Sequence, residues 1–211
     1  MNVPRITLHG ARLSGHVHRV VLLLEMLQIP YKSVDTPAEA RKSAEFLRLN
    51  RLGQIPVLED GETVIADSNA ILVYLAKRYA PGQQWLPEEP VAASRVQRWL
   101  SIAAGELTYG PARARLIAQW GYPSDPGLAA TISERLFRFM DSHLSDREYL
   151  ACDHATIADL ACYAYVAHAP EGGISLEPYA ALRRWLSRVE ALPRFQPLPR
   201  SPLPPNMSGA G

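Results

Sequence analysis

The chain has 211 residues, enough to bury a hydrophobic core in one or two domains. Its 22 basic and 21 acidic residues nearly cancel, so the composition gives no signal for nucleic acid or for a membrane surface. No apolar run approaches the roughly 20 residues that span a bilayer, and the N-terminus lacks a signal-peptide pattern. The two cysteines, Cys152 and Cys162, do not read as a disulfide framework. These features predict a soluble cytoplasmic protein.

The first eighty residues mix short strands with short helices. Apolar residues alternate in the strands and recur at helical spacing in the helices. Pro30 ends the first helix because proline disfavours the α conformation of the residue before it. Asp60-Gly61 lies between two strands and is a strong hairpin signal. Strands are predicted at residues 6–9, 31–34, 56–59 and 63–66, and helices at 16–28, 43–49 and 68–79. The order β-α-β-α-β-β-α predicts a thioredoxin-like domain.

Beyond residue 80 the pattern becomes helical, and no convincing strand follows. Thr156-Ile157-Ala158-Asp159 is a capping-box-like helix start, a hydroxyl followed three residues later by a carboxylate. Helices are predicted at residues 91–120, from 127 to about 144, at 157–167 and at 179–191. The proline-dense tail is expected to lack regular structure and to lie on the surface or be disordered. The predicted parts are a thioredoxin-like domain (1–80), a linker (81–90), an all-helical domain (91–192) and a tail (193–211).

The most informative motif is Gly53-Gln54-Ile55-Pro56, followed by Asp67-Ser68. Proline cannot donate to a sheet ladder, so Pro56 marks a strand start or a special turn. This leaves the backbone of Ile55 free to pair with an extended peptide. Asp67-Ser68 opens a helix whose first N–H groups suit a carboxylate, while the Asp67 side chain can hold an ammonium group. Together these features predict a site for a small zwitterionic peptide.

Two other chemistries find no support in the sequence. A thioredoxin-like domain invites a search for Cys-x-x-Cys, but no cysteine precedes Cys152, so a dithiol site is excluded. His9, His16 and His18 could suggest a metal, yet no carboxylate or thiol completes a ligand set with them. We therefore expect no metal site.

The turn after the first strand carries Ser14, just before a helix that reads Val17-His18-Arg19-Val20. With the motifs above, this resembles the cytosolic glutathione transferases, and most of all their serine-type members, the plant phi class and related bacterial enzymes. Ser14 falls where that family places its catalytic serine. The resemblance covers the chain up to its tail and rests on residues 14–20, 42–56, 67–71 and 156–159.

The resemblance implies a two-domain fold, a C2 homodimer, and conjugation of glutathione to a small hydrophobic electrophile. Ser14 would stabilise the glutathione thiolate. Ile55, before a cis Pro56, would bind the cysteinyl backbone. Gln54 and Lys42 would bind the glycyl end, and Asp67 with Ser68 the γ-glutamyl end. The electrophile pocket would include Arg12, Leu13, Tyr109 and Arg113.

Three positions depart from the family pattern. Arg51 replaces a proline that often precedes the Gly-Gln pair. Asp67 stands where many members carry glutamate, which shortens the reach of the same charge. Arg41 stands where a histidine is common, so the contact to the glycyl carboxylate is open.

The proposed task of Ser14 is reasonable in energy. A free thiol titrates near ~8.5, so only about 3% is ionised at pH 7. Lowering that pKa by about two units requires ~2.7 kcal/mol. A hydrogen bond to a charged group is worth roughly 1.5–3 kcal/mol, and a helix N-terminus adds up to ~2 kcal/mol. Ser14 at the start of the first helix can supply both.

Each assignment has a structural alternative. Ser14 can be a helix cap alone, and Asp67 with Ser68 can cap a helix as well as bind. Lys42 can be a solvated charge and Tyr109 a packing residue. Isomerase, dehalogenase and peroxidase activities share this fold with transferases and are not separable by sequence. A non-catalytic docking protein is a further alternative, although it has no need of both Ser14 and Asp67-Ser68.

Overall fold

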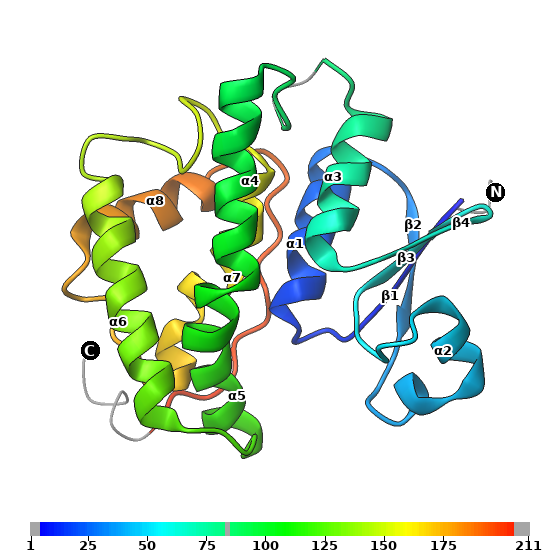
Figure 1. Cartoon of the computed structure of the whole chain (residues 1–211), viewed down its shortest axis with the longest axis horizontal. Helices are drawn as coiled ribbons and strands as arrows, with labels where there is room; N and C mark the ends of the chain where they lie inside the picture. Colours follow the sequence, from blue (N-terminus) through cyan, green and yellow to red (C-terminus); the bar gives the residue numbers. More distant parts are fainter. Residues whose placement is uncertain (1–4, 83–84, 205–211) are drawn as a thin grey trace.

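The computed structural model describes residues 5–82 and 85–204 (Figure 1). It shows a small sheet with its helices in the N-terminal part and a helical C-terminal part beside it. The sheet has four strands in the order β2-β1-β3-β4. β1 is parallel to β2 and antiparallel to β3, and β3 is antiparallel to β4. The strands are β1 (Ile6–Gly10), β2 (Tyr31–Asp35), β3 (Val57–Asp60) and β4 (Thr63–Ala66).

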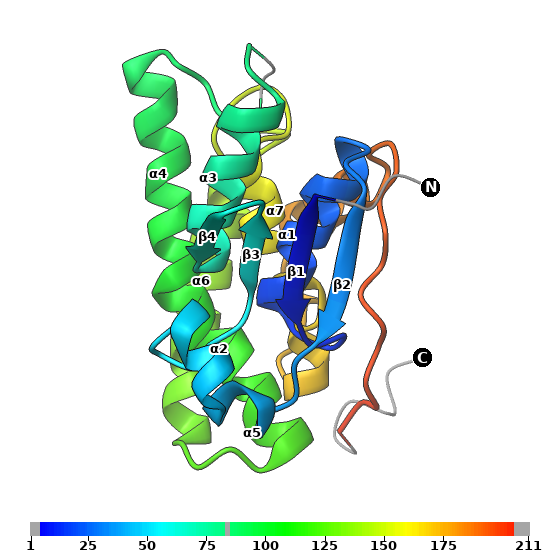
Figure 2. The ribbon, with the colours of Figure 1, turned by 90° about the vertical axis from the view of Figure 1, so that its right-hand side faces the viewer.

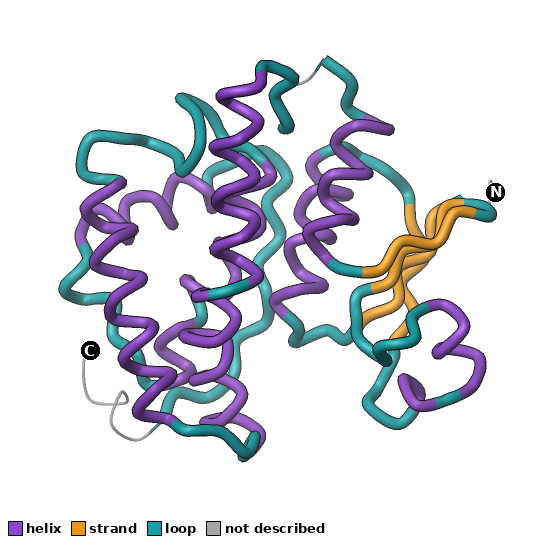
Figure 3. The backbone as a smooth tube through the Cα atoms, in the orientation of Figure 1, coloured by secondary structure: helices purple, strands orange, loops and turns teal. Residues whose placement is uncertain are grey.

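The N-terminal helices lie on opposite faces of this sheet. They are α1 (Gly15–Met26), α2 (Ala44–Leu49), which follows a short 3-10 turn (Ala40–Lys42), and α3 (Ser68–Tyr79). Figure 3 shows α1 and α3 between the sheet and the helical part, with α2 on the far side. This element order confirms the predicted thioredoxin-like arrangement. The N-terminal ends of α1 and α3 therefore face the helical part near the same edge.

The hairpin turn differs by one residue from its prediction. Asp60 pairs with Thr63 in the ladder, so the two-residue turn is Gly61-Glu62 and not Asp60-Gly61. Gly61 has φ +61, a value that glycine adopts without steric cost. Asp60 stays in the strand because its buried carboxylate accepts a hydrogen bond from Tyr74 (2.7 Å) and a second from Tyr79.

The helical part follows β4, and within the described residues no further strand occurs. The predicted continuous helix over 91–120 is wrong, because the chain leaves the helical conformation at Gly105 (ψ −102). Pro111 then sits in a short π-helical turn, since it has no N–H for an α-helical ladder. The elements are α4 (Pro90–Ala104), the π turn (Thr108–Ala112), α5 (Arg113–Trp120), α6 (Pro126–His143), α7 (Ile157–Ala167), a 3-10 turn (Ala169–Gly172) and α8 (Ala180–Glu190). None of the described helices is long and apolar enough to cross a membrane.

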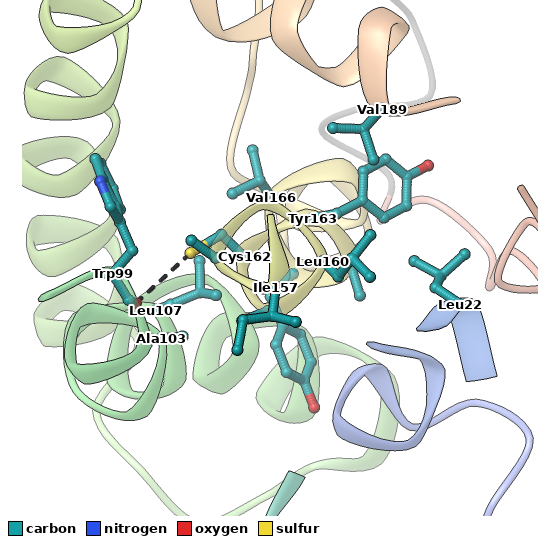
Figure 4. Packing of buried hydrophobic residues seen from close by; sticks show 14 of the residues in the cluster. Leu22, Trp99, Ala103, Leu107, Ile157, Leu160, Cys162, Tyr163, Val166 and Val189 are labelled. Carbon is teal, nitrogen blue, oxygen red and sulfur yellow. Dashed lines mark hydrogen bonds between the residues drawn. The ribbon is translucent and has the colours of Figure 1, made fainter. Parts of the chain in front are cut away.

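Helix α7 forms the centre of the helical core and is buried along nearly its whole length (Figure 4). Leu22 of α1, Trp99 of α4 and Val189 of α8 pack around it. The Cys162 thiol lies 3.9 Å from the carbonyl oxygen of Trp99, and burial raises the pKa of this thiol to about 12. Cys162 is therefore a core residue and not a nucleophile.

The tail contains neither helix nor strand over residues 196–204, as predicted. It is nevertheless held against the protein, and Figure 2 shows it running down the side of the molecule beyond β2. His18 Nε2 lies 2.7 Å from the Gln196 carbonyl oxygen, and Leu198 is buried. Ser201 donates its backbone N–H to Glu171 (2.9 Å). The tail thus lies on the surface, the first of the two expectations, while residues 205–211 lie outside the described part.

Candidate functional site

A cavity of about 1080 Å³ opens between the N-terminal ends of α1 and α3 and the helical part. Nearly all of the residues that the sequence analysis singled out line it. They are Arg12, Leu13, Ser14, Gln54, Ile55, Pro56, Asp67, Ser68, Tyr109 and Arg113. Residues from loops far apart in the sequence therefore share one space.

Lys42 does not belong to this lining. Its side chain is exposed and its Nζ pairs with Glu39 at 3.0 Å, as a solvated surface charge does. The neighbouring Arg41 lines the cavity instead, with its Nε donating to the Thr36 carbonyl oxygen (2.9 Å). A cation at this end of the cavity is thus present, but one residue earlier than the sequence analysis placed it.

Ser14 is the N-cap of α1. Its backbone is extended (φ −80, ψ 120), and its Oγ accepts a hydrogen bond from the Val17 N–H at 3.3 Å. A hydroxyl that accepts one hydrogen bond still has its own proton to donate. Capping of the helix and donation into the cavity are therefore compatible roles for this side chain.

The loop before β3 presents the backbone of Ile55 to the cavity. The Ile55–Pro56 bond is cis, as predicted. Asn50 steadies the loop, since its Nδ2 donates to the Gln54 carbonyl oxygen (2.8 Å) and its Oδ1 accepts from the Leu52 N–H (3.1 Å). Ladder pairing begins only at Val57, and among residues 5–82 and 85–204 no hydrogen bond engages the Ile55 backbone. Its N–H and C=O are free to pair with an extended peptide.

Asp67 and Ser68 form the corner at the start of α3. Asp67 caps the helix, accepting from the N–H groups of Asn69 and Ala70, both at 2.9 Å. It does so at φ +77, a left-handed conformation that is uncommon for a non-glycine residue and is frequent at functional sites. Asn69 donates to the carbonyl oxygen of Leu100 (3.0 Å), which ties this corner to α4.

Arg19 lies behind the Asp67-Ser68 corner and was not predicted as a site residue. Its Nη1 donates to Ser68 Oγ (3.1 Å) and to Asn69 Oδ1 (2.9 Å). The side chain is 1% exposed, and its Nε and Nη2 have no hydrogen-bond partner in the described part of the chain. Burial lowers its pKa from the ordinary value, but a guanidinium stays charged at pH 7. A lone arginine on an apolar helix face was the signal that could have revealed it.

Tyr165 of α7 is the second unpredicted residue. Its ring contacts His16 edge-on, with centroids 4.9 Å apart, and it lies directly over Gly15. A Cβ added to Gly15 would come within 2.8 Å of the ring, so any larger residue would displace Tyr165. Burial raises the pKa of Tyr165, while hydrogen bonding with Ser14 and the His16 backbone acts in the opposite direction. Tyr165 brings a hydroxyl from the helical part to the start of α1.

The positive charge of the cavity comes from arginine and not from histidine. Burial, with a smaller contribution from Arg19, lowers the pKa of His16 to about 3, so its ring is neutral at pH 7. His18 is likewise lowered to about 4 by burial. No group of three His, Cys, Asp or Glu side chains suited to a metal ion occurs among the described residues.

The chain matches a known family along most of its length. The model of the glutathione S-transferase N-terminal domain matches residues 8–84, and that of the glutathione S-transferase C-terminal domain matches residues 129–193. Glutathione S-transferase 3 of Zea mays is 30% identical, and the match covers 97% of this chain and 98% of the relative.

Solved structures agree with this. A glutathione S-transferase from Pseudomonas fluorescens Pf-5 superposes with a TM-score of 0.86 at 30% identity, covering 92% of this chain and 98% of that one. A glutathione transferase homologue from Drosophila mojavensis, solved with bound glutathione, has a TM-score of 0.81 at 27% identity, covering 89% and 88%. The chain therefore belongs to the glutathione S-transferase family.

Proposed function

We propose that this protein conjugates glutathione to a small electrophile, and that the Ser14 hydroxyl stabilises the attacking thiolate. The observation that carries the proposal is the convergence of three features on one cavity. These are the capping hydroxyl of Ser14, the unpaired backbone of Ile55 and the Asp67-Ser68 corner. Each suits a different part of a peptide that has a thiol in its middle and a zwitterionic end.

The assignments follow from the chemistry of each group. The backbone of Ile55 pairs with the cysteinyl residue. The Asp67 carboxylate takes the γ-glutamyl ammonium, and Ser68 with the N–H groups of α3 takes the carboxylate beside it. Arg19 stands directly behind this corner and adds a positive charge. Gln54 and Arg41 bind the glycyl end. Arg41 lines the cavity and takes the role expected of Lys42, which does not line it.

Ser14 donates a hydrogen bond to the sulfur and does not itself attack. Both groups favour the thiolate over the thiol: the hydroxyl by roughly 1.5–3 kcal/mol and the positive end of α1 by up to ~2 kcal/mol. The sulfur then bonds to the electrophilic carbon, and the leaving group departs with the electron pair of its broken bond. No general base stronger than water is required, because the thiol is already largely ionised before it meets the electrophile.

Calorimetric titration tests the binding half of this proposal. Glutathione is expected to bind, whereas the dipeptide Cys-Gly, which lacks the γ-glutamyl group, is expected to bind at least about tenfold more weakly, since it forfeits a charged hydrogen bond. γ-Glu-Cys should keep most of the affinity. Equal binding of Cys-Gly and glutathione would contradict the role of Asp67-Ser68. Turnover of 1-chloro-2,4-dinitrobenzene, followed by absorbance of the thioether, tests the transfer itself.

We also propose a C2 homodimer located in the cytoplasm, with a role in detoxification. Membership of the family supports this assembly, and in it the Asp67 corner lies near the helical part of the partner. An isologous contact is the usual arrangement for a dimer of identical chains. Light scattering at micromolar concentration should give twice the chain mass of 23.4 kDa. A mass of one chain would refute the dimer and leave the proposed glutathione site unaffected.

A further inference from the structure

The wall of the cavity formed by the helical part carries more positive charge than its own contacts neutralise. We call this wall, with the adjoining turn, the electrophile half, defined by Arg12, Leu13, Tyr109, Arg113, Leu116 and Trp120. Five arginines line the whole cavity, and among its described lining residues Asp67 is the only acid. Asp67 is committed to the cap of α3 at the opposite end.

Three of the five arginines have other partners. Arg115 is buried and pairs with Glu171 at 2.6 Å, and it also donates to the Leu13 carbonyl oxygen at 2.8 Å. Arg19 and Arg41 belong to the glutathione end, where they donate to the α3 corner and to the Thr36 carbonyl oxygen. Arg12 and Arg113 remain, and neither has an ion pair with any residue that the structure describes. The excess charge therefore lies in the electrophile half.

Arg113 is held by aromatic rings instead of a carboxylate. The guanidinium carbon lies 4.4 Å from the centroid of the Tyr122 ring and 5.7 Å from that of Tyr109. Its Nε is buried and has no hydrogen-bond partner among the described residues. Stacking on a ring occupies the faces of a guanidinium but leaves its N–H groups in the plane free, in the fork geometry that matches a carboxylate. The guanidinium of Arg113 is thus held in place by the two rings, while its Nε–H lacks a hydrogen-bond acceptor among the described residues.

Flat apolar surface lies beside these charges. Tyr109 is 58% exposed and Trp120 is 51% exposed, although both line the cavity. Large exposed aromatic side chains in a concave site are surfaces on which a planar ring can stack. A ligand that satisfies both features has an aromatic ring and an anionic substituent.

We propose that the preferred electrophiles of this enzyme are aromatic compounds that carry a carboxylate or sulfonate, with the anion bound by Arg113 and Arg12. This inference rests on the proposed function and names the substrate class of that same site. The occupant supplies a counter-ion to the partly buried guanidinium of Arg113, and the exposed Arg12 lies at the same cavity to share it. The ring stacks against Tyr109 and Trp120, with the reacting carbon toward Ser14.

A suitable probe is 4-chloro-3,5-dinitrobenzoate, compared with its uncharged carboxamide. The glutathione sulfur forms a bond to the carbon that bears chlorine, and the ring with its nitro groups takes up the electron pair. Chloride then leaves with the electrons of the C–Cl bond, which restores the aromatic ring. The carboxylate is unchanged, so it acts only as a binding group.

The test compares kcat/KM for the two compounds. Each value is divided by the second-order rate constant of the uncatalysed reaction between glutathione thiolate and the same compound, which removes the difference in intrinsic reactivity. The natural enzyme is expected to favour the benzoate by about tenfold or more, the effect of one charge-assisted hydrogen bond. Arg113→Met keeps an unbranched apolar stem but removes the guanidinium fork. It should lower kcat/KM for the benzoate about tenfold more than kcat/KM for the carboxamide, mainly through KM. Arg113→Lys should restore part of the preference. Arg138→Met, an exposed arginine of α6, is the matched control for lost net charge.

A second measurement needs no variant. 3,5-Dinitrobenzoate should inhibit turnover of 1-chloro-2,4-dinitrobenzene about tenfold more strongly than 3,5-dinitrobenzamide does, and added salt should narrow the difference. Equal normalised kcat/KM values for the benzoate and the carboxamide would overturn the inference while leaving the transferase function intact. An equal decrease of both values in Arg113→Met would do the same. Turnover of 1-chloro-2,4-dinitrobenzene without turnover of the benzoate would also overturn the inference alone. Absence of turnover of all three compounds would refute the proposed function and this inference with it.

Discussion

Replacing Asp159 with alanine is expected to lower the free energy of unfolding by about 3–5 kcal/mol, because it strips the partners from several buried donors. Asp159 is fully buried. Its Oδ1 accepts from the Leu150 N–H (3.0 Å) and from the Trp185 Nε1–H (2.9 Å). Its Oδ2 accepts from the Thr156 N–H (2.9 Å) and contacts the Thr156 hydroxyl (3.3 Å). One carboxylate thus joins the start of α7 to the loop before it and to α8.

Urea unfolding followed by far-UV circular dichroism measures this loss. Asp159→Asn distinguishes the contributions of the two carboxylate oxygens to stability. The amide can keep the contacts of Oδ1, but it places an N–H opposite the Thr156 N–H. It should therefore remain clearly destabilised. Glu134→Ala, which breaks an exposed ion pair with Arg138 on α6, should change stability by only about 0.5 kcal/mol. An Asp159→Ala variant as stable as Glu134→Ala would show that these hydrogen bonds contribute little.

The N-terminal part could be predicted from the sequence because its signals are local. Prolines, a hairpin glycine and helix-capping residues mark its boundaries, and each acts through the backbone of its immediate neighbours. The one-residue error at Asp60 has a tertiary cause, since the carboxylate contacts Tyr74 and Tyr79 of α3. The predicted helix over 91–120 failed for a different reason, which is local to the backbone. Apolar periodicity continues through the π turn, so the pattern does not reveal where the backbone departs from α geometry.

The sequence predicts the site residues that belong to local motifs, but not those that only helix packing brings to the cavity. Ser14, Ile55 and Asp67 belong to motifs and line the cavity. Arg19 and Tyr165 reach it only because α1 packs against α7, a contact between segments about 145 residues apart in the chain. Lys42 and Arg41 are adjacent, and sequence spacing alone cannot decide which of two neighbours in a turn points inward. The division at residues 80 and 90 remains a prediction.

Replacing Ser14 with alanine is expected to reduce turnover near neutral pH by about ten- to hundredfold, since the thiolate loses a hydrogen bond worth ~1.5–3 kcal/mol. Glutathione binding should change little, because Ile55 and the Asp67-Ser68 corner carry the affinity. The pKa of the bound thiol should rise by about one to two units. Part of the activity should return at alkaline pH, where a thiol that titrates near ~8.5 ionises without help.

The same substitution also removes a helix cap, so its effect on folding stability must be distinguished from its effect on the thiol pKa. Ser43 offers the matched control: it caps α2 in the same way, its Oγ accepting from the Phe46 N–H at 3.1 Å, and it is outside the cavity lining. Both Ser14→Ala and Ser43→Ala should lose about 1 kcal/mol of stability. Only Ser14→Ala should shift the absorbance titration of the glutathione thiolate. Superimposable titration curves for the natural enzyme and Ser14→Ala would leave Ser14 as a cap alone, and the stabilisation of the thiolate would then have to come from the N-terminus of α1 and from Tyr165.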